Sequence, residues 1–320
     1  MTAKVKNTLS WILKIGISVA VIWYLTNKLI EAGYQLQDVS KISILPAVIS
    51  LVLVPLNLGL GAQKWRIMVR NFYPKLSFEQ SFGAILAGMT TGIFTPNRIG
   101  EYGGRVFMLP PGKRLEAVII TFIDRVCQMM VTVWMGSLAL IGFIYYILDI
   151  SPWLKFTFIF SLLIINGMLV LLAFSRSSVI RILAKFRHYK YLRIAQVTLE
   201  RLSPGIFGKV LSLAIIRYLV FTFQFVLLLY AFGYDKGVFL AVWMILLIYL
   251  LKSFAPSIAL SELGVRETIA VYVMEQFHVA DPTISFNSTF LLYLFNIALP
   301  SVFGMVFLPR LKFFGKKSGL

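Results

Sequence analysis

Several apolar stretches of about 20 residues run through this chain, and they limit its fold more than any other feature. A helix of that length crosses the hydrocarbon core of a bilayer and satisfies its own backbone hydrogen bonds there. Hydrophobic residues make up 59% of the chain and charged residues only 14%. The sequence therefore predicts an all-α integral membrane protein. We expect residues 1–320 to form a single transmembrane domain.

Six of the apolar stretches have the length of full spans, at about residues 9–29, 42–62, 115–148, 154–174, 206–232 and 284–308. Basic loops mark the cytoplasmic side of a membrane protein. Two basic segments flank these spans, with Lys64, Arg66, Arg70 and Lys75 after the second span and Arg310, Lys312, Lys316 and Lys317 at the end. Placing both segments in the cytoplasm puts both termini there. No clear small-residue cleavage site follows the first span, so we expect it to be retained.

Two further apolar segments, residues 77–109 and 238–277, are interrupted near their middles. The first breaks at Thr95-Pro96-Asn97 and the second at Ala255-Pro256, where proline removes a backbone donor. Basic loops flank the first segment on both sides, and the charge balance requires the second to enter and leave on the opposite side. These features predict two re-entrant helical hairpins in an inverted-topology repeat. The expected halves, about 1–174 and 205–320, are joined by a basic cytoplasmic segment, 175–204.

A similar polar motif follows each interruption. The first reads FTPNRIGEYGGR from Phe94 to Arg105, and the second reads FAPSIALSELGVRE from Phe254 to Glu267. Both open with Phe-x-Pro, and both contain Glu-x-Gly-x-Arg. Polar, helix-breaking segments at corresponding places in the two halves of a membrane protein point to a substrate site between the repeats.

Charged side chains cost about 2.5–3.5 kcal/mol each at the membrane centre, so they must pair or line a wet cavity. Glu101–Arg105 and Glu262–Arg266 are spaced four residues apart, which places each pair on one helix face. Such pairs either neutralise each other structurally or contact a substrate, and for Asp124 the structural partner would be Arg125. The candidate substrate-binding residues are Arg98, Glu101, Arg105, Asp124, Arg125, Glu262, Arg266 and Glu267.

The backbone at the two interruptions is the other candidate part of the site. A half-helix that begins after a break offers N–H groups and a positive dipole end to an anion. Glycine lets another backbone or a ligand approach closely. A phosphate-bearing lipid headgroup suits such a place, because arginines hold phosphate through paired hydrogen bonds. The residues concerned are Pro96, Gly100, Gly103, Gly104, Pro256 and Gly264.

Charge and composition exclude several other classes of function. The net charge of +18 would suggest nucleic-acid binding in a soluble protein, but here it indicates cytoplasmic loops and contact with anionic lipid. The segment Arg176–Arg201 is the most basic and predicts an amphipathic helix on anionic headgroups. The single cysteine, Cys127, excludes an intrachain disulfide, and two histidines supply no zinc cluster. We expect no metal, cofactor or nucleic-acid partner, and no catalytic constellation indicates an enzyme.

The stretches TPNRIGEYGGR and LGVRE, together with Asp124-Arg125, resemble the lysylphosphatidylglycerol synthase transmembrane region, a flippase-like family. The resemblance covers nearly the whole chain and implies a helical fold with inverted re-entrant elements that moves lipids between leaflets. Asn97 stands where glycine would be common, and Ser261-Glu262 replaces a glycine-rich approach to the second motif. No aminoacyl-transfer domain follows, so we expect a stand-alone membrane domain. The matching positions are Pro96, Arg98, Gly100, Glu101, Arg105, Asp124, Arg125, Gly264, Arg266 and Glu267.

The sequence thus predicts a lipid flippase of the bacterial inner membrane. Its substrate would be a phosphate-containing lipid: an aminoacyl-phospholipid, another modified phospholipid or a polyprenyl-phosphate lipid. Transport would run downhill or be coupled to an ion, with a buried carboxylate as the proton carrier. Two alternatives stay open. One is a membrane-embedded enzyme, or enzyme subunit, that acts on lipid-linked sugars, and the other is a membrane anchor for a separate soluble synthase.

Overall fold

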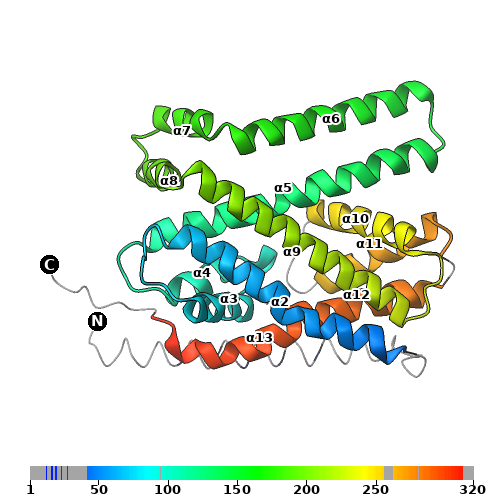
Figure 1. Cartoon of the computed structure of the whole chain (residues 1–320), viewed down its shortest axis with the longest axis horizontal. Helices are drawn as coiled ribbons and strands as arrows, with labels where there is room; N and C mark the ends of the chain where they lie inside the picture. Colours follow the sequence, from blue (N-terminus) through cyan, green and yellow to red (C-terminus); the bar gives the residue numbers. More distant parts are fainter. Residues whose placement is uncertain are drawn as a thin grey trace.

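The computed structural model describes residues 42–93, 95–255, 262–279 and 281–312, with five isolated positions nearer the start of the chain. Within these ranges the chain folds into helices and contains no strand (Figure 1). The prediction of an all-α membrane protein is confirmed. Apart from those isolated positions, the predicted first span lies outside the described residues, as do Pro256 and the basic residues Lys316 and Lys317.

Five helices in the described part of the chain are long and apolar enough to cross a bilayer. They are α2 (Ile44–Val69), α5 (Arg114–Tyr146), α6 (Pro152–Phe174), α9 (Pro204–Ala231) and a continuous last helix. The last helix comprises α12 (Pro282–Tyr293), η3 (Leu294–Ala298), α13 (Leu299–Gly304) and η4 (Met305–Arg310). Proline occupies the first turn of α6, α9 and α12, where its missing N–H costs nothing. These helices match five of the six predicted spans, while the full number of spans stays a prediction.

Two pairs of shorter helices complete the bundle. The first pair is α3 (Phe78–Gly92) and α4 (Gly100–Phe107), joined through the short η2 (Pro96–Arg98). The second pair is α10 (Val238–Phe254) and α11 (Glu262–Gln276). None exceeds 17 residues, or about 25 Å, so none alone crosses a hydrocarbon core of about 30 Å. The helices therefore break within the intervals that the sequence predicts.

The two short pairs begin and end at opposite ends of the molecule. In Figure 1 the connections that enter α3 and leave α4 lie at the left, whereas those that enter α10 and leave α11 lie at the right. A capping box fixes the start of α3, because Ser77 and Gln80 each accept a hydrogen bond from the other's backbone N–H. This arrangement is the one that re-entrant hairpins would have. The repeat relation between the halves stays a prediction.

Two apolar cores support the two short pairs. One joins α2, α3, α4 and the first part of α5 around the fully buried Trp65 and Ile120. The other joins α9, α10, α11 and α12 around Phe225, Met244 and Ile245. Residues of both cores line the cavity described below.

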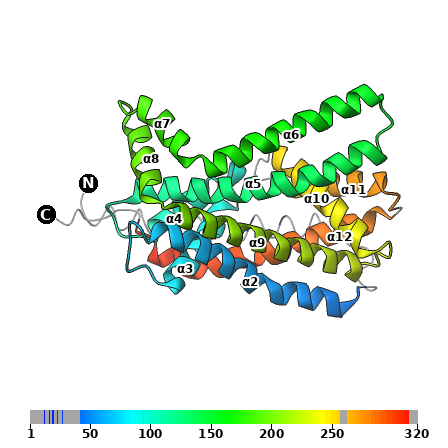
Figure 2. The same ribbon diagram turned by 45° about the horizontal axis from the view of Figure 1, so that its top comes forward.

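The segment between the predicted halves differs from expectation in one respect. Instead of one amphipathic helix over Arg176–Arg201, it forms two helices, α7 (Arg176–Lys185) and α8 (Lys190–Arg201). The chain turns between them at 186–189, and α7 and α8 pack against each other. The preceding helix α6 extends away from the bundle (Figure 2), and its apolar stretch of 20 residues has no buried residue. Such a surface suits contact with lipid.

Candidate functional site

A cavity of about 610 Å³ lies between the two short helix pairs. Its walls come from both pairs and from the long helices α2, α5 and α9, and η3 contributes at one side. Apolar walls are provided by residues such as Ile85, Phe225 and Ile248. The charged residues that line it among the described side chains are Lys64, Arg98, Glu101, Arg105, Asp124, Arg125, Arg217, Lys252 and Arg266.

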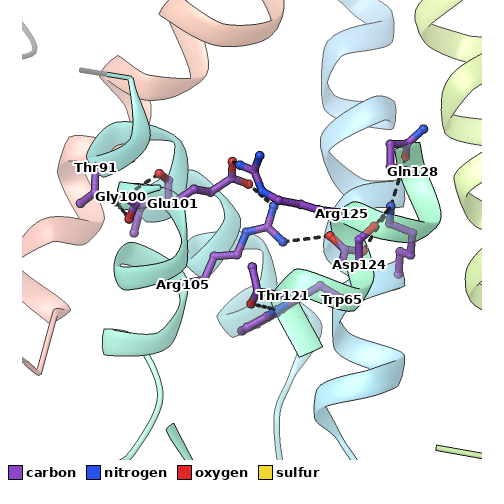
Figure 3. Close-up of polar contacts among 12 residues, drawn as sticks. Trp65, Thr91, Gly100, Glu101, Arg105, Thr121, Asp124, Arg125 and Gln128 are labelled. Carbon is purple, nitrogen blue, oxygen red and sulfur yellow. Dashed lines mark hydrogen bonds and ion pairs between the residues drawn. The ribbon is translucent and has the colours of Figure 1, made fainter. Parts of the chain in front are cut away.

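The carboxylates of Glu101 and Asp124 organise an ion-pair network on one side of this cavity (Figure 3). Arg105 bridges them, with Nη1 at 3.1 Å from Asp124 Oδ2 and Nη2 on Glu101 Oε1. Arg125 donates to the other oxygen of Glu101. Each carboxylate thus contacts two cations, since Lys64 also pairs with Asp124. Burial strengthens these interactions, because water screens them little there.

The predicted position of Lys64 in a basic loop is wrong. The pattern Lys64, Arg66, Arg70 predicts a cytoplasmic loop, but α2 continues to Val69 and buries the Lys64 side chain completely. Its Nζ lies 3.2 Å from Asp124 Oδ1 and 3.1 Å from Gln128 Oε1. A buried lysine needs such partners, because an uncompensated charge is very costly in a low-dielectric interior. Asp124 likewise pairs with Lys64 and Arg105 and not with its neighbour Arg125.

A second polar network connects three helices next to the ion pairs. Asn57 on α2 donates to Gln224 Oε1 at 3.3 Å and to Asn296 Oδ1 at 3.2 Å. Its own oxygen accepts a 2.7 Å hydrogen bond from Arg217 Nε on α9. Asn296 lies in η3, where the last helix widens into a π-helical turn. Such turns occur often at functional sites.

Glycines bring α3 and α4 into close contact. Gly100 and Gly104 are one helical turn apart on α4, and a methyl group at Gly104 would lie 2.2 Å from Thr91 Oγ1 and 2.6 Å from Ala87 O. The close approach places Thr91 Oγ1 at 2.8 Å from the carbonyl oxygen of Gly100, to which it donates. These glycines therefore serve helix packing that positions Glu101 and Arg105. A methyl group added at Gly103 would instead meet the ring of Phe107, on the same helix, at 3.5 Å.

The start of α4 differs from the anion site that the sequence suggests. The N–H of Gly100 already donates to Thr95 Oγ1 at 2.8 Å, so it is not available to a ligand. Two preceding residues, Asn97 and Arg98, have left-handed φ angles of 48° and 57°. Left-handed backbone favours glycine and tolerates asparagine, which explains why Asn97 can stand where glycine would be common. The turn directs Arg98 to the cavity wall.

We expect Asn97→Val to destabilise the protein, whereas Asn97→Gly should leave its stability little changed. A β-branched residue in the left-handed conformation costs about 1–2 kcal/mol, while glycine adopts it freely. Thermal unfolding of both variants in detergent would measure the difference. An equal loss in both would mean that the Asn97 side chain, and not its backbone conformation, matters at this position.

The second motif reaches the site through Arg266. Its guanidinium lines the cavity and lies over the ring of Tyr293, 5.7 Å from the ring centre. Glu267 is buried but is not part of the cavity wall. Gly264 is exposed, and a methyl group added there would meet no neighbouring atom of the described residues within 4 Å, so close packing against them does not require glycine at this position. Pro256 and the side chain of Glu262 lie outside the described residues, so the predicted Glu262–Arg266 pair stays a prediction.

Several site residues were missed by sequence reasoning. They share helical spacing within apolar spans: Asn57, Gly61 and Lys64 recur on one face of α2, and Arg217 and Gln224 on one face of α9. Polar residues that repeat at three, four or seven positions in a membrane helix usually face the protein interior. That periodicity in the sequence indicates these residues, although for Lys64 the nearby Arg66 and Arg70 suggest a basic loop instead.

One side of the cavity wall also faces outward. Phe122, Val126 and Met129 lie on one face of α5, line the cavity and are 59%, 38% and 48% exposed. The apolar surface of a spanning helix contacts acyl chains in a bilayer. The cavity therefore joins a charged interior to an exposed apolar surface on a helix long enough to span a membrane.

These features define a multi-pass helical membrane protein with a charged cavity between two short helix pairs. The chain belongs to the family described as the lysylphosphatidylglycerol synthase TM region, whose model matches residues 11–304. This confirms the resemblance noted from the two motifs. The family is a membrane domain linked to lipid modification or translocation. Comparisons with curated proteins and with solved structures returned no match.

Proposed function

We propose that the protein is a flippase that moves a phosphate-containing lipid between the two leaflets of a membrane. The headgroup would enter the charged cavity while the acyl or prenyl chains stay in the bilayer. The observation that carries the proposal is the cavity itself, which combines buried arginines with an apolar wall open to lipid at Phe122, Val126 and Met129. A headgroup and its chains need these two environments side by side.

The ion-pair network supports a way for the headgroup to bind. Arg105 and Arg125 both hold Glu101, a carboxylate that occupies the position of an anion between two guanidinium groups. A phosphate carries several acceptor oxygens and forms strong charge-assisted hydrogen bonds with arginine. We propose that the headgroup phosphate exchanges with Glu101 for these arginines during passage. Arg98, at the tip of the first pair, and Arg266, on the second pair, would receive it at either side.

The two short helix pairs support a route across the membrane. They begin and end at opposite ends of the bundle, and both contribute to the cavity wall (Figure 1). We propose that they are the gates of an inverted-topology repeat and open alternately to the two sides. Transport would run downhill in lipid concentration or be coupled to an ion. No observation in the described part of the chain favours catalysis over transport.

The cellular setting is part of the same proposal. We propose the bacterial inner membrane, with both termini in the cytoplasm. The helices α7 and α8 would lie on anionic headgroups, because the side chains of Arg181, Lys185 and Lys190 are exposed there. A separate lipid-modifying synthase would supply the transported lipid.

We expect Arg125→Gln to reduce lipid exchange between leaflets to about one tenth or less of the wild-type rate. Losing one charge-assisted hydrogen bond to phosphate costs about 1.5–3 kcal/mol, and 1.4 kcal/mol corresponds to a tenfold change. Arg125 lines the cavity, and its side chain is 32% exposed, so the substitution leaves no large buried gap. The measurement is dithionite reduction of labelled phosphatidylglycerol and labelled short-chain polyprenyl phosphate in proteoliposomes.

The control is Lys113→Gln, which removes one exposed positive charge just before the same helix. It should exchange lipid at the wild-type rate. If correctly inserted wild-type protein exchanged no lipid of any class, the flippase proposal would be abandoned in favour of an enzyme subunit.

A further inference from the structure

We infer that the cavity selects headgroups with two or more negative charges on phosphate, and that Arg217 is the specificity-determining residue. The inference rests on the proposed function for the statement that the bound molecule is a transported lipid. The binding site itself can be tested separately. Phosphomonoesters of diacylglycerol and of polyprenols, and their diphosphates, share this chemistry.

Arg217 differs from the other arginines around the ion-pair network. Arg105 and Arg125 contact carboxylates, whereas no carboxylate in the described part of the chain lies within ion-pair distance of Arg217. Its hydrogen-bond partner is Asn57 Oδ1, which accepts from Nε at 2.7 Å. The two terminal Nη groups take no part in this hydrogen bond and remain available to a ligand, because Arg217 lines the cavity.

The guanidinium of Arg217 is held in a fixed orientation. Asn57 is 2% exposed, and its amide is in turn fixed by hydrogen bonds to Gln224 and Asn296. Gly61 lies beneath the group, since a methyl at that position would touch its Cζ at 3.5 Å. An arginine that is orientated in advance loses little side-chain entropy when it binds phosphate, so its hydrogen bonds contribute more to affinity.

The balance of charge around the cavity favours a multiply charged anion. Among the described side chains that line it, seven are cationic, and only Glu101 and Asp124 are anionic. Adding both carboxylates of the second motif, Glu262 and Glu267, still leaves the cations in the majority. Excess positive charge in a low-dielectric site attracts anions strongly and repels cations.

This balance argues against an aminoacyl-phospholipid as the preferred ligand. A lysyl ester adds two ammonium groups to a single phosphate, so the headgroup has a net positive charge and would meet the cations of the cavity. Glu101 and Asp124 are each already paired with two cations, so most of their charge is neutralised before an ammonium arrives. A phosphomonoester, in contrast, brings nearly two negative charges and three acceptor oxygens at neutral pH.

The test is ligand-induced thermal stabilisation of the purified full chain in detergent, which does not depend on transport. Probes are the short-chain forms of phosphatidate, prenyl phosphate, phosphatidylglycerol and lysyl-phosphatidylglycerol, with inorganic phosphate alongside. A ligand that binds only the folded protein raises its melting temperature in proportion to ln(1 + [L]/Kd). We expect phosphatidate and prenyl phosphate to bind at least about tenfold more tightly than phosphatidylglycerol, and lysyl-phosphatidylglycerol to give no shift.

Substitutions at Arg217 test whether this residue binds the phosphate. Arg217→Gln should weaken phosphatidate binding about tenfold or more, and Arg217→Lys should be intermediate, because it keeps the charge and loses the planar fork. Lys209→Gln is the matched control, since Lys209 is exposed and lies eight residues earlier on the same helix. It should bind phosphatidate like the wild type.

The outcomes separate the two proposals. Equal binding of lysyl-phosphatidylglycerol and phosphatidate, or full retention of phosphatidate binding by folded Arg217→Gln, would overturn the inference. Binding of inorganic phosphate as tight as that of the lipids would also overturn it as a lipid site.

If lipids with more negative headgroups bound more tightly but none crossed between leaflets in proteoliposomes, the binding site would stand and the flippase proposal would fail. If lipids crossed between leaflets but their affinities did not follow headgroup charge, the flippase proposal would stand and the proposed selectivity would fail. The class of lipid that carries the phosphate is the one, phosphatidate or prenyl phosphate, that produces the larger shift in melting temperature.

Discussion

Gly104→Ala should destabilise the first helix pair by about 3 kcal/mol and abolish lipid exchange. A methyl group at this position would lie 2.2 Å from Thr91 Oγ1 and 2.6 Å from both Ala87 O and Gly88 Cα. Two of these contacts are with backbone atoms of α3, so no side-chain rotation can relieve them. The helices α3 and α4 would have to separate. Glu101 and Arg105 flank Gly104 on α4, and separation would move both away from Asp124.

The neighbouring glycine provides a closely matched control. In Gly103→Ala the added methyl would meet only the ring of Phe107, at 3.5 Å, which is an ordinary van der Waals distance. Both variants add one methyl group to the same helix, so they differ only in the surface that receives it. Thermal unfolding in detergent and leaflet exchange in proteoliposomes would measure both. Comparable losses in the two variants would show that helix propensity, and not the contact with α3, explains the effect.

The helices of this protein were largely predictable, because each apolar run had to become a helix in lipid. The two interruptions were also predictable, since Pro96 prevents an uninterrupted helix and α3 ends at Gly92 shortly before it. The pair Glu101–Arg105 followed from spacing alone, because residues four apart share a helix face. These features depend on local sequence, so they can be predicted without knowing how distant helices pack.

The remaining contacts depend on how distant helices pack. Asp124 and Arg125 are adjacent in sequence, but consecutive residues on a helix point in different directions and do not face each other. Their partners come instead from α2 and α4, at Lys64, Arg105 and Glu101. Lys64 lies only six residues before Arg70, and the sequence pattern groups both into one basic loop. Whether a lysine near a helix end is solvated or buried is decided by the helix that packs against it.

Because α2 packs against α5, we also expect a large loss of stability when Asp124 on α5 is replaced. Asp124→Asn should reduce the free energy of unfolding by about 3–5 kcal/mol, because it leaves buried cations without their counter-charge. Lys64 has no exposed side-chain surface, and Asp124 is its only ion-pair partner among the described residues. Arg105 would retain Glu101 but lose the carboxylate at 3.1 Å. Denaturant titration in mixed micelles would measure the loss.

The double variant Lys64→Met with Asp124→Asn distinguishes a broken ion pair from a general loss of packing. Methionine fills much of the volume of lysine without a charge, so the double variant should recover at least about 1 kcal/mol relative to Asp124→Asn alone. Glu116→Gln is the matched control, because Glu116 lies in the first turn of the same helix and has no ion pair among the described residues. Its stability should change by less than about 0.5 kcal/mol. If the double variant were no more stable than Asp124→Asn, the unpaired charge of Lys64 would not explain the loss of stability. The loss would then come from the hydrogen bond that Asp124 accepts from Arg105.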